Sequence, residues 1–481
     1  MHHEHPLKIL KYSAKNIWLL IFPLIRGISA MKLDVNKLYV WLKGAWFDIL
    51  VILLIIVFGF IKWYFSKITF TETAVLHKKG ILIKSNKVIP YESLASVTRE
   101  HAYYLRPFKA VRLYADTCAG IMKSSDMKLL LSYRVCSELM NILPQSEHES
   151  KVVYRYKPKF IFIFFFSVLF SSSFSGVIYI AAFFFEGGQI AQDIIRTSLD
   201  RFTAEASKFL IVNIPYAVLT VTVLISGAWF ISFVTNMVRY SGFFIRRYKH
   251  VIGIESGRIT PRKFLINQDK INYFYLKQNL LMKIFRVMSV NVSCAGYGTG
   301  RNKNYPLLLP IESKRRIEED FKNATGIKYN SKRQFKPHFS GLWNYIWLAV
   351  FITAAIFPIF YILPQFFSEL KEAARFFTIM AEIPALWYLI IRIAALITSG
   401  VTIDGDIIYV RYSKRYDLYT IISERQKLVK LDIKQNMFQK YISHKCTVKF
   451  YFYSETTEPH YVKGIKLKEA KEIAEKCLIN Y

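Results

Sequence analysis

The sequence has few cysteines, few acidic residues and none of the common catalytic motifs. Its five cysteines are odd in number and include no C-x-x-C pair, which disfavours a disulfide framework and a zinc site. No G-x-x-x-x-G-K-S/T, H-E-x-x-H or G-x-S-x-G motif occurs, so the common nucleotide-binding, zinc-protease and serine-hydrolase classes find no support. We therefore expect no catalytic residues, no cofactor and no metal, and thiols that stay reduced.

Acidic residues are outnumbered, because 34 Asp and Glu stand against 66 Lys and Arg, a formal net charge of +32. Such an excess favours an anionic partner, either nucleic acid or the anionic leaflet of a membrane. The chain is also 53% hydrophobic, with a mean hydropathy of +0.23, which is unusual for a soluble protein. Together these values favour anionic membrane lipid as the partner and argue against nucleic acid.

Six apolar stretches lie along the chain in three pairs. A membrane-crossing helix needs about 20 apolar residues, a length that the second to fifth stretches reach. The first stretch is short, and the sixth contains Arg392. The pattern predicts about six transmembrane helices in three hairpins. The stretches are Ile17–Ile25, Ala45–Phe65, Phe160–Phe185, Phe209–Val234, Leu342–Leu363 and Ile383–Gly400.

Lysine and arginine are distributed unevenly around these stretches. The segments after the second, fourth and sixth stretches are basic, whereas the connection Glu186–Lys208 is nearly balanced in charge. Basic residues are retained on the cytoplasmic side of a membrane. The asymmetry predicts that the soluble segments and both termini are cytoplasmic, although the basic connection Arg26–Lys43 disagrees.

Three basic segments follow the apolar pairs, and each has the pattern of short strands that end in a helix. They repeat one another: Gly80 matches Gly257, and Phe108-Lys109 matches Phe285-Arg286, whereas the third segment has Lys414 in place of the glycine. The chain therefore divides into three hairpins and three related modules. The predicted divisions are residues 1–65 (tail and first hairpin), 66–156 (first module), 157–240 (second hairpin), 241–331 (second module), 332–400 (third hairpin) and 401–481 (third module).

Several short segments of the first repeat, together with this layout, resemble the bacterial pleckstrin-homology-like family whose domains flank membrane segments, in particular its three-domain members. The segments are His5-Pro6-Leu7, Val88-Ile89-Pro90-Tyr91-Glu92-Ser93-Leu94, Leu105-Arg106-Pro107-Phe108, Val111–Tyr114 and Cys118-Ala119-Gly120. The resemblance implies a seven-stranded, strongly bent antiparallel sheet capped by a C-terminal helix in each module. The expected fold is thus an α+β membrane protein with about six transmembrane helices alternating with three pleckstrin-homology-like β-sandwich or barrel modules.

The resemblance also implies a place and a role. It implies a multi-pass protein of the bacterial plasma membrane, with a smaller single-domain relative or a second copy as partner. It further implies a link to envelope stress or to tolerance of antimicrobial peptides. Our leading interpretation is a non-enzymatic scaffold or interaction platform at the membrane. The alternative is a transporter or lipid-handling protein that uses intramembrane polar residues.

Basic side chains near the apolar stretches are the candidate contacts for anionic lipid. Ordinary retention of positive charge on the cytoplasmic side also explains them, without any recognition of lipid. The candidates are Lys78, Lys79, Arg246, Arg247, Lys249, Arg262, Lys263, Lys414 and Arg415.

Three further features allow two interpretations each. The run Gly296-Tyr297-Gly298-Thr299-Gly300 is either a phosphate cradle or a flexible hairpin tip, and no helix start follows it. The cluster of His2, His3 and His5 beside Glu4 is either a metal site or part of a mobile terminus. Among intramembrane charges, Asp48 is expected at an interface, and Arg392 is expected either to be functional or to reach toward an interface.

Overall fold

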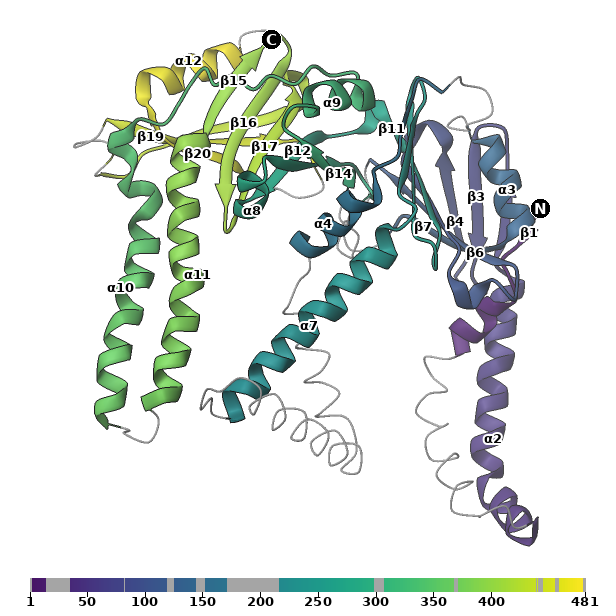
Figure 1. Cartoon of the computed structure of the whole chain (residues 1–481). Coiled ribbons are helices and arrows are strands. Elements are labelled where there is room, and N and C mark those ends of the chain that lie inside the picture. The colour runs from purple at the N-terminus through teal and green to yellow at the C-terminus, as the bar shows by residue number, and fades with distance from the viewer. Residues whose placement is uncertain are drawn as a thin grey trace.

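Three repeats of helices followed by β-strands build the chain, and each repeat ends in a short helix (Figure 1). The computed structural model describes residues 2–13, 35–81, 83–118, 125–143, 152–170, 216–297, 307–366, 371–437, 439, 444–454 and 458–478. The long helices α2 (Val35–Tyr64), α7 (Tyr216–Tyr240), α10 (Trp343–Phe366) and α11 (Lys371–Thr398) project from one side of the sheets.

The first module consists of two small antiparallel sheets and a closing helix. The side chain of Ser132 caps that helix by accepting a hydrogen bond from the backbone N–H of Val135 at 3.5 Å. The elements are β1 (His2–His3), β2 (Lys67–Phe70), β3 (Ala74–Lys79), β4 (Ser85–Pro90), η1 (Tyr91–Ser93), β5 (Leu94–Glu100), η2 (Tyr103–Leu105), β6 (Ala110–Thr117), β7 (Met127–Ser132) and α3 (Tyr133–Ile142).

The second module repeats this order, with α4 and α7 ahead of its sheets. Gly326, at a φ of 83°, ends its closing helix in the left-handed conformation that glycine adopts without strain. The elements are β8 (Tyr154–Tyr156), α4 (Phe160–Phe170), α7, β9 (Phe244–Arg247), β10 (Val251–Ser256), β11 (Arg262–Asn267), η3 (Gln268–Lys270), β12 (Tyr273–Asn279), α8 (Leu280–Ile284), β13 (Val287–Ser293), β14 (Leu307–Ser313) and α9 (Ile317–Thr325).

The third module follows α10 and α11 in the same order. The closing helix α12 buries Ala470 and Ile473 against its sheets, as the apolar stripe in the sequence predicts. The elements are η4 (Phe339–Gly341), α10, α11, β15 (Gly400–Asp404), β16 (Ile407–Lys414), β17 (Asp417–Glu424), η6 (Arg425–Lys427), β18 (Leu428–Lys434), β19 (Lys445–Phe452), β20 (His460–Lys466) and α12 (Leu467–Leu478).

The same unusual backbone conformation marks equivalent positions in the three modules. Lys109, Arg286 and His444 have positive φ values of 52°, 55° and 50°, which L-residues rarely adopt. In each case the carbonyl accepts a hydrogen bond from the residue that follows the module's last strand or begins its closing helix. The match of Lys109 with Arg286, inferred from the sequence, therefore extends to the backbone and to the third module.

The first strand of each module comes from the chain segment that precedes its helices. β1 pairs with β2, β8 pairs with β9, and Phe335 forms an isolated bridge with Val401 at the start of β15. The first and second modules each hold seven strands in this way, the number that the family resemblance implies. The domain boundaries inferred from the sequence remain predictions.

Neighbouring modules share continuous sheets. β5 of the first module pairs with β11 of the second, giving a seven-stranded sheet in the order β7-β6-β5-β11-β10-β9-β8. β12 of the second pairs with β17 of the third, giving a six-stranded sheet in the order β14-β13-β12-β17-β16-β15. The backbone ladder, together with the apolar clusters beneath it, therefore holds the three modules in one row.

No helix in the part of the chain that the structure describes is both long and apolar enough to cross a bilayer. For these residues the prediction of six transmembrane helices is overturned, and with it the multi-pass location in a plasma membrane. The prediction counted apolar residues along the sequence, whereas the charged residues Glu382 and Arg392 lie inside α11. The stretch Ile17–Ile25 lies outside the described residues, as do some side chains of the four longest helices.

Gly296 lies where the first two modules touch most closely. Its φ is 75°, and a Cβ built there would lie 2.2 Å from Oδ2 of Asp116. The substitution Gly296→Ala should therefore add a clash to the left-handed strain of roughly 1–2 kcal/mol, with overpacking of about 1–3 kcal/mol. Thermal unfolding of the purified full chain checks this.

Gly405→Ala is the matched control, because Gly405 also has a positive φ (59°) but has open space around its added Cβ. The control should lower the unfolding midpoint less than Gly296→Ala does. Equal midpoints for the two variants would contradict a close contact at this junction.

Candidate anion-binding site

The nine cations singled out in the sequence do not all meet in one site, although Arg262 and Lys263 line the same hollow. Arg247 donates to the carbonyl of Asn323 at 3.0 Å, and burial lowers the pKa of its guanidinium. Arg262 forms an ion pair with Glu100 at 3.1 Å across the first junction. Their contacts make both residues part of the scaffold that joins sheets and helices.

Other members of this set of cations either lie near acidic residues or are exposed. Lys263 and Arg246 lie 3.8 and 3.7 Å from Glu255, and Lys414 pairs with Glu458 at 2.5 Å. The remaining four are exposed on separate surfaces of different modules, namely Lys78, Lys79, Lys249 and Arg415.

Arg392 belongs to the attachment of α11 to the third module. Its guanidinium donates to Oγ of Ser413 at 3.1 Å and to the carbonyl of Arg415, and it lies 4.6 Å from the centre of the Tyr388 ring. These contacts position a helix on a sheet. The side chain of Asp48 lies outside the described residues.

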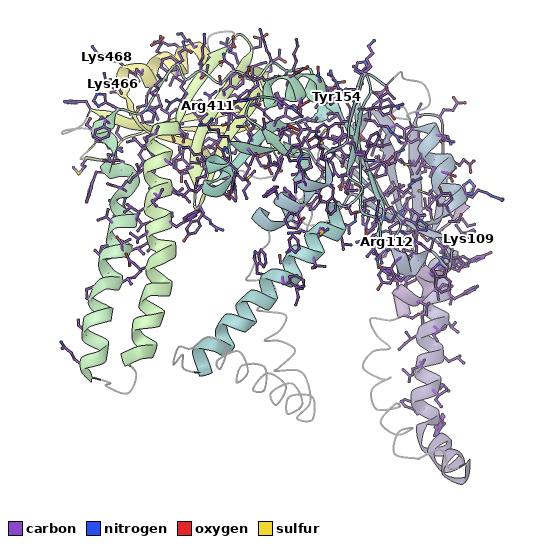
Figure 2. All side chains as sticks on the ribbon, in the orientation of Figure 1. Lys109, Arg112, Tyr154, Arg411, Lys466 and Lys468 are labelled. Carbon is purple, nitrogen blue, oxygen red and sulfur yellow. The ribbon has the colours of Figure 1, made fainter. Side chains whose placement is uncertain are left out.

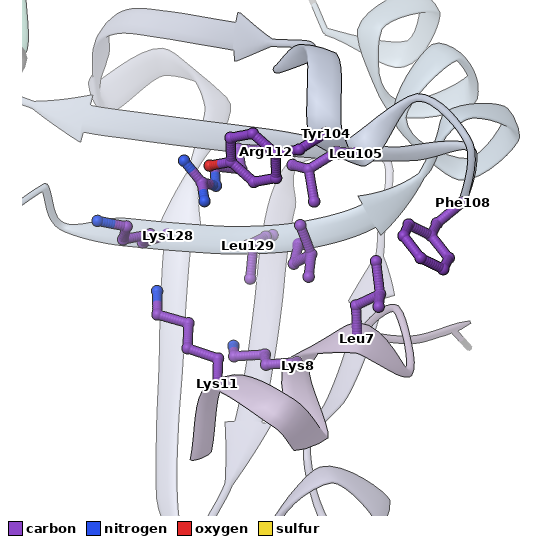
Figure 3. A pocket seen from close by; sticks show the side chains of 10 residues that line it. Leu7, Lys8, Lys11, Tyr104, Leu105, Phe108, Arg112, Lys128 and Leu129 are labelled. Carbon is purple, nitrogen blue, oxygen red and sulfur yellow. The ribbon is translucent and has the colours of Figure 1, made fainter. Parts of the chain in front are cut away.

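The most distinctive hollow of the described chain lies in the first module, between the N-terminal helical turn and the strands β6 and β7 (Figure 3). Its volume is about 330 Å³. Four cations line one part of it, and apolar and aromatic side chains line the other. The cations are Lys8, Lys11, Arg112 and Lys128, and the remaining lining residues are Leu7, Tyr104, Leu105, Phe108, Leu129 and Leu130.

The N-terminal tail forms one wall of this basic pocket because several hydrogen bonds hold it in place. The backbone N–H of His5 donates to Leu130 at 2.7 Å, and its ring Nε2 lies 3.0 Å from the carbonyl of Phe108. The indole of Trp63, near the end of α2, donates to the carbonyl of Glu4 at 2.6 Å. The interpretation of a mobile terminus is therefore wrong.

A buried polar cluster stands behind this wall. The carboxylate of Glu4, 1% exposed, pairs with Lys8 and accepts from the hydroxyl of Ser66 at 2.9 Å. Ser66 also lies 3.1 Å from Nε2 of His77. The hydroxyl of Ser66 has a single proton, which it donates to Glu4. The ring Nε2–H of His77 is therefore the donor to Oγ of Ser66.

Positive charge accumulates in the basic pocket. Burial lowers the pKa of Lys11, and the nearby charges of Lys128 and Arg112 lower it further, while Glu4 opposes them. Glu4 is already paired with Lys8, so its charge compensates little of the remaining three. Arg112 lies 5.3 Å from the Tyr104 ring centre and Lys128 lies 5.0 Å from that of Tyr114, so both cations also contact aromatic rings.

The two strand cations of the basic pocket, Arg112 and Lys128, have no cationic counterparts in the other modules. Three residues after the positive-φ position, Arg112 is replaced by Ser289 and Thr447 in the other modules. Five residues before the equivalent residues Tyr133, Lys314 and Leu467, the position of Lys128 is occupied by Leu309 and Val462. Figure 2 shows Arg112 in the first module, far from Lys466 and Lys468 in the third.

The glycine run does not form an anion cradle at its described end. Gly296 faces the carboxylate of Asp116, and burial raises the pKa of that carboxyl to about 6. A carboxylate at this place disfavours phosphate. Residues 298–300 of the run lie outside the described residues.

The N-terminal histidines have structural contacts. His2 and His3 form β1, and the ring of His3 lies 5.5 Å from that of Trp63. Within the described residues no group of three histidine, cysteine or acidic side chains is arranged to hold a metal ion.

A second hollow of about 230 Å³ lies at the first junction, lined in part by Arg99, His101, Arg262 and Glu255. Glu255 lines the hollow itself, and Arg262 is paired with Glu100. Lys263 also lines this hollow. Because Glu100 and Glu255 offset two of its three cations, it is a weaker candidate for an anion than the basic pocket.

The sequence reasoning missed Lys8, Lys11, Arg112 and Lys128. They come from the tail and from two strands separated by a hairpin, so no spacing in the sequence brings them together. One signal was available: Lys8 and Lys11 are three residues apart and follow His5-Pro6-Leu7, a segment that the family resemblance already singled out.

Two antiparallel sheets closed by a C-terminal helix recur along the chain. The chain belongs to the bacterial PH domain family, since the profile of that family matches residues 24–148 and 207–324, about half of the chain. PH-like domains are generally non-catalytic modules for membrane-associated interaction or scaffolding. No curated protein and no solved structure matches the chain. The three-domain type remains a prediction.

Burial lowers the pKa of His77 to about 4, against 6.5 in an unfolded chain. A depressed pKa means that the neutral ring contributes stability above about pH 6.5, which is lost as the pH falls toward 4. We expect a loss of up to about 3 kcal/mol over this interval. The variant His77→Gln, which keeps a donor for Ser66, should show a shallower loss.

Denaturant unfolding of both proteins between pH 7 and pH 4 measures this. The control is His250→Gln, at a ring that is 63% exposed, and it should follow the wild type. An unchanged pH dependence in His77→Gln would contradict a buried neutral ring.

Proposed function

We propose that this chain is a non-enzymatic, membrane-associated scaffold whose first module binds the anionic headgroup of a lipid in the basic pocket. The observation that carries the proposal is the combination of Lys11, Arg112 and Lys128 with an apolar wall in one hollow. Its volume of about 330 Å³ lies within the range of small-molecule sites. The family match supports an interaction module without catalysis.

The chemistry of the basic pocket favours an amphiphile. Its cations provide donors and positive charge for a phosphate, whereas Leu7, Leu105 and Phe108 provide contacts for carbon chains. A small inorganic anion would contact only the cations and would leave the apolar side chains without a partner.

The surroundings of the basic pocket support the same choice. α2 meets the module beside the pocket, and it exposes large apolar side chains such as Trp46 (60%) and Phe58 (58%). Exposed apolar surface of this extent marks an interaction site. A headgroup in the pocket would place its lipid chains next to that surface.

Other parts of the expected role remain predictions. The smaller single-domain relative and the link to antimicrobial peptides come from the family resemblance alone. The transporter alternative required Arg392 to line a path, and its contacts with Ser413 and Arg415 give that alternative no support.

Removing three charges from the basic pocket should weaken binding to anionic vesicles. Each Lys or Arg near an anionic surface contributes about 1 kcal/mol, so Lys11→Gln, Arg112→Gln and Lys128→Gln together should cost roughly 100-fold in affinity. Co-sedimentation of the full chain with phosphatidylcholine vesicles, with and without phosphatidylglycerol, measures the change. Glycerol phosphate as a competitor separates headgroup recognition from binding that needs the bilayer.

The matched control removes three exposed lysines of the third module by Lys466→Gln, Lys468→Gln and Lys471→Gln. It makes the same change in net charge and should weaken binding much less. Equal losses in the two triple variants would indicate a diffuse attraction and contradict the basic pocket. Thermal unfolding of each variant shows that folding is kept.

A further inference from the structure

The two junctions between modules use one register. Counting from the C-cap of the 3-10 helix, the residue three positions on is Val97 in β5 and Phe274 in β12. Counting back from the N-cap of that helix, the residue two positions earlier is Leu265 in β11 and Ile422 in β17. The structure pairs Val97 with Leu265 and Phe274 with Ile422. The modules therefore join by the same residue-to-residue contact twice.

The contact buries the positions that it joins. Val97 and Leu265 are each 1% exposed, and Phe274 and Ile422 are 4% and 0% exposed. At each junction, the strand that follows the 3-10 helix of one module pairs with the strand that precedes the 3-10 helix of the next module. Each module thus has one edge of each kind.

The row consequently ends in two unused edges. In the described part of the chain, β4 pairs only with β3, and β18 pairs only with β19. β4 is the first module's counterpart of β11 and β17, and β18 is the third module's counterpart of β5 and β12. The two edges are therefore the complementary halves of the junction that is formed twice inside the chain.

The edge strands β4 and β18 expose apolar side chains, whereas the equivalent side chains at the two internal junctions are buried. Val88 of β4 is 56% exposed, whereas its counterparts Leu265 and Ile422 are buried. Val429 of β18 is 66% exposed, whereas its counterpart Ala95 is 0% exposed. Unpaired edges with exposed apolar residues readily pair with another strand.

We propose that β18 of one copy of this chain pairs with β4 of a second copy, in the register of the internal junctions. This interaction goes beyond the headgroup pocket and does not depend on it. Main-chain hydrogen bonds would provide affinity and the side chains would provide register, as in other cases where a strand extends a sheet.

The side chains are complementary in that register. Leu431, three residues after the C-cap Leu428, would lie opposite Val88, two residues before the N-cap Pro90. The next pair would be Asp432 opposite Lys87, which are oppositely charged. Opposite charges across a strand pair contribute roughly 0.2–1 kcal/mol.

Two residues of β4 are of the kinds that commonly protect an exposed strand from pairing. Lysine and proline commonly block exposed edges, and β4 contains Lys87 and Pro90. Lys87 would meet Asp432, and Pro90 occupies the position of Asn267, which the first junction leaves beyond its paired residues. Neither residue opposes the proposed pairing.

The resulting contact joins different surfaces of the two copies. Such an interface either closes into a ring or continues as an open array. Every copy would add three modules to one continuous row, and each basic pocket would recur once per copy.

Disulfide trapping of the full chain in mild detergent tests the pairing. Chains with Lys87→Cys are mixed with chains that carry Asp432→Cys, and the mixture is oxidised. Opposite residues in an antiparallel pair lie about 4.5–5.5 Å apart between Cα atoms, which a disulfide can bridge. We expect a covalent dimer with one chain of each kind. Lys87→Cys mixed with Lys434→Cys, an exposed position two residues along, should give at least several-fold less.

Charge reversal supplies the second measurement. Asp432→Lys alone and Lys87→Asp alone should lower the average mass by light scattering. A mixture of the two single variants should restore pairing between unlike chains, because both contacts between them again join opposite charges. Mass and disulfide yield that track these changes support the proposal.

Three results would overturn it: chains that stay single at all concentrations without a trapped dimer, equal trapping by Asp432→Cys and Lys434→Cys, or trapping of Asp432→Cys in cells exclusively to a different protein. The last result would assign the β18 edge to another partner, such as a smaller relative with its own β4-like strand. Unfolding midpoints near that of the wild type show that the variants fold.

Discussion

Backbone pairing between modules is the constraint on which the arrangement of this molecule depends. β5 with β11 and β12 with β17 turn three small modules into one row, and their ladders bury apolar side chains of both partners. A module of this size buries little apolar surface alone, and sharing a sheet enlarges the core that each has. This pairing also sets the orientation of the long helices, because they are attached to sheets that the neighbouring modules hold in place (Figure 1).

The basic pocket depends on the same framework in a different way. Its floor belongs to β6 and β7, but its wall is the tail, which β1 and the buried Glu4 attach to the start of the first sheet. A polar group buried this deeply is stable only when paired. Lys8 and Ser66 are the partners of Glu4, and His77 is a partner of Ser66. Positive charge can then accumulate around Lys11 without a competing free carboxylate. The other modules have Ser289 and Thr447 in place of Arg112, and Leu309 and Val462 in place of Lys128, which explains why only one pocket of this kind is found among the described residues.

Local patterns predicted strands followed by a closing helix, but predicted neither the nature of the long helices nor the site. The matches of Gly80 with Gly257 and of Lys109 with Arg286 are local signals, and the structure bears them out, because both members of each pair have a positive φ. The pairing of β1 with β2 and the junctions between modules join residues far apart in the chain, and no local pattern encodes such register. Counting apolar residues likewise could not tell where helices begin and end. The nine predicted cations were selected by position near apolar stretches, whereas Arg112 and Lys128 meet through strand pairing.

The origin of each module's first strand has a consequence for how the chain can change. β1 and β2, β8 and β9, and Phe335 and Val401 close the helices of each repeat into a loop anchored at both ends in one sheet. The entropic cost of closing a flexible loop rises by only about 0.6 kcal/mol for each doubling of its length. Helices can therefore be lengthened, shortened or exchanged between these anchors at small cost to the sheets. The sheets can therefore keep their structure while the helices between the anchor points vary.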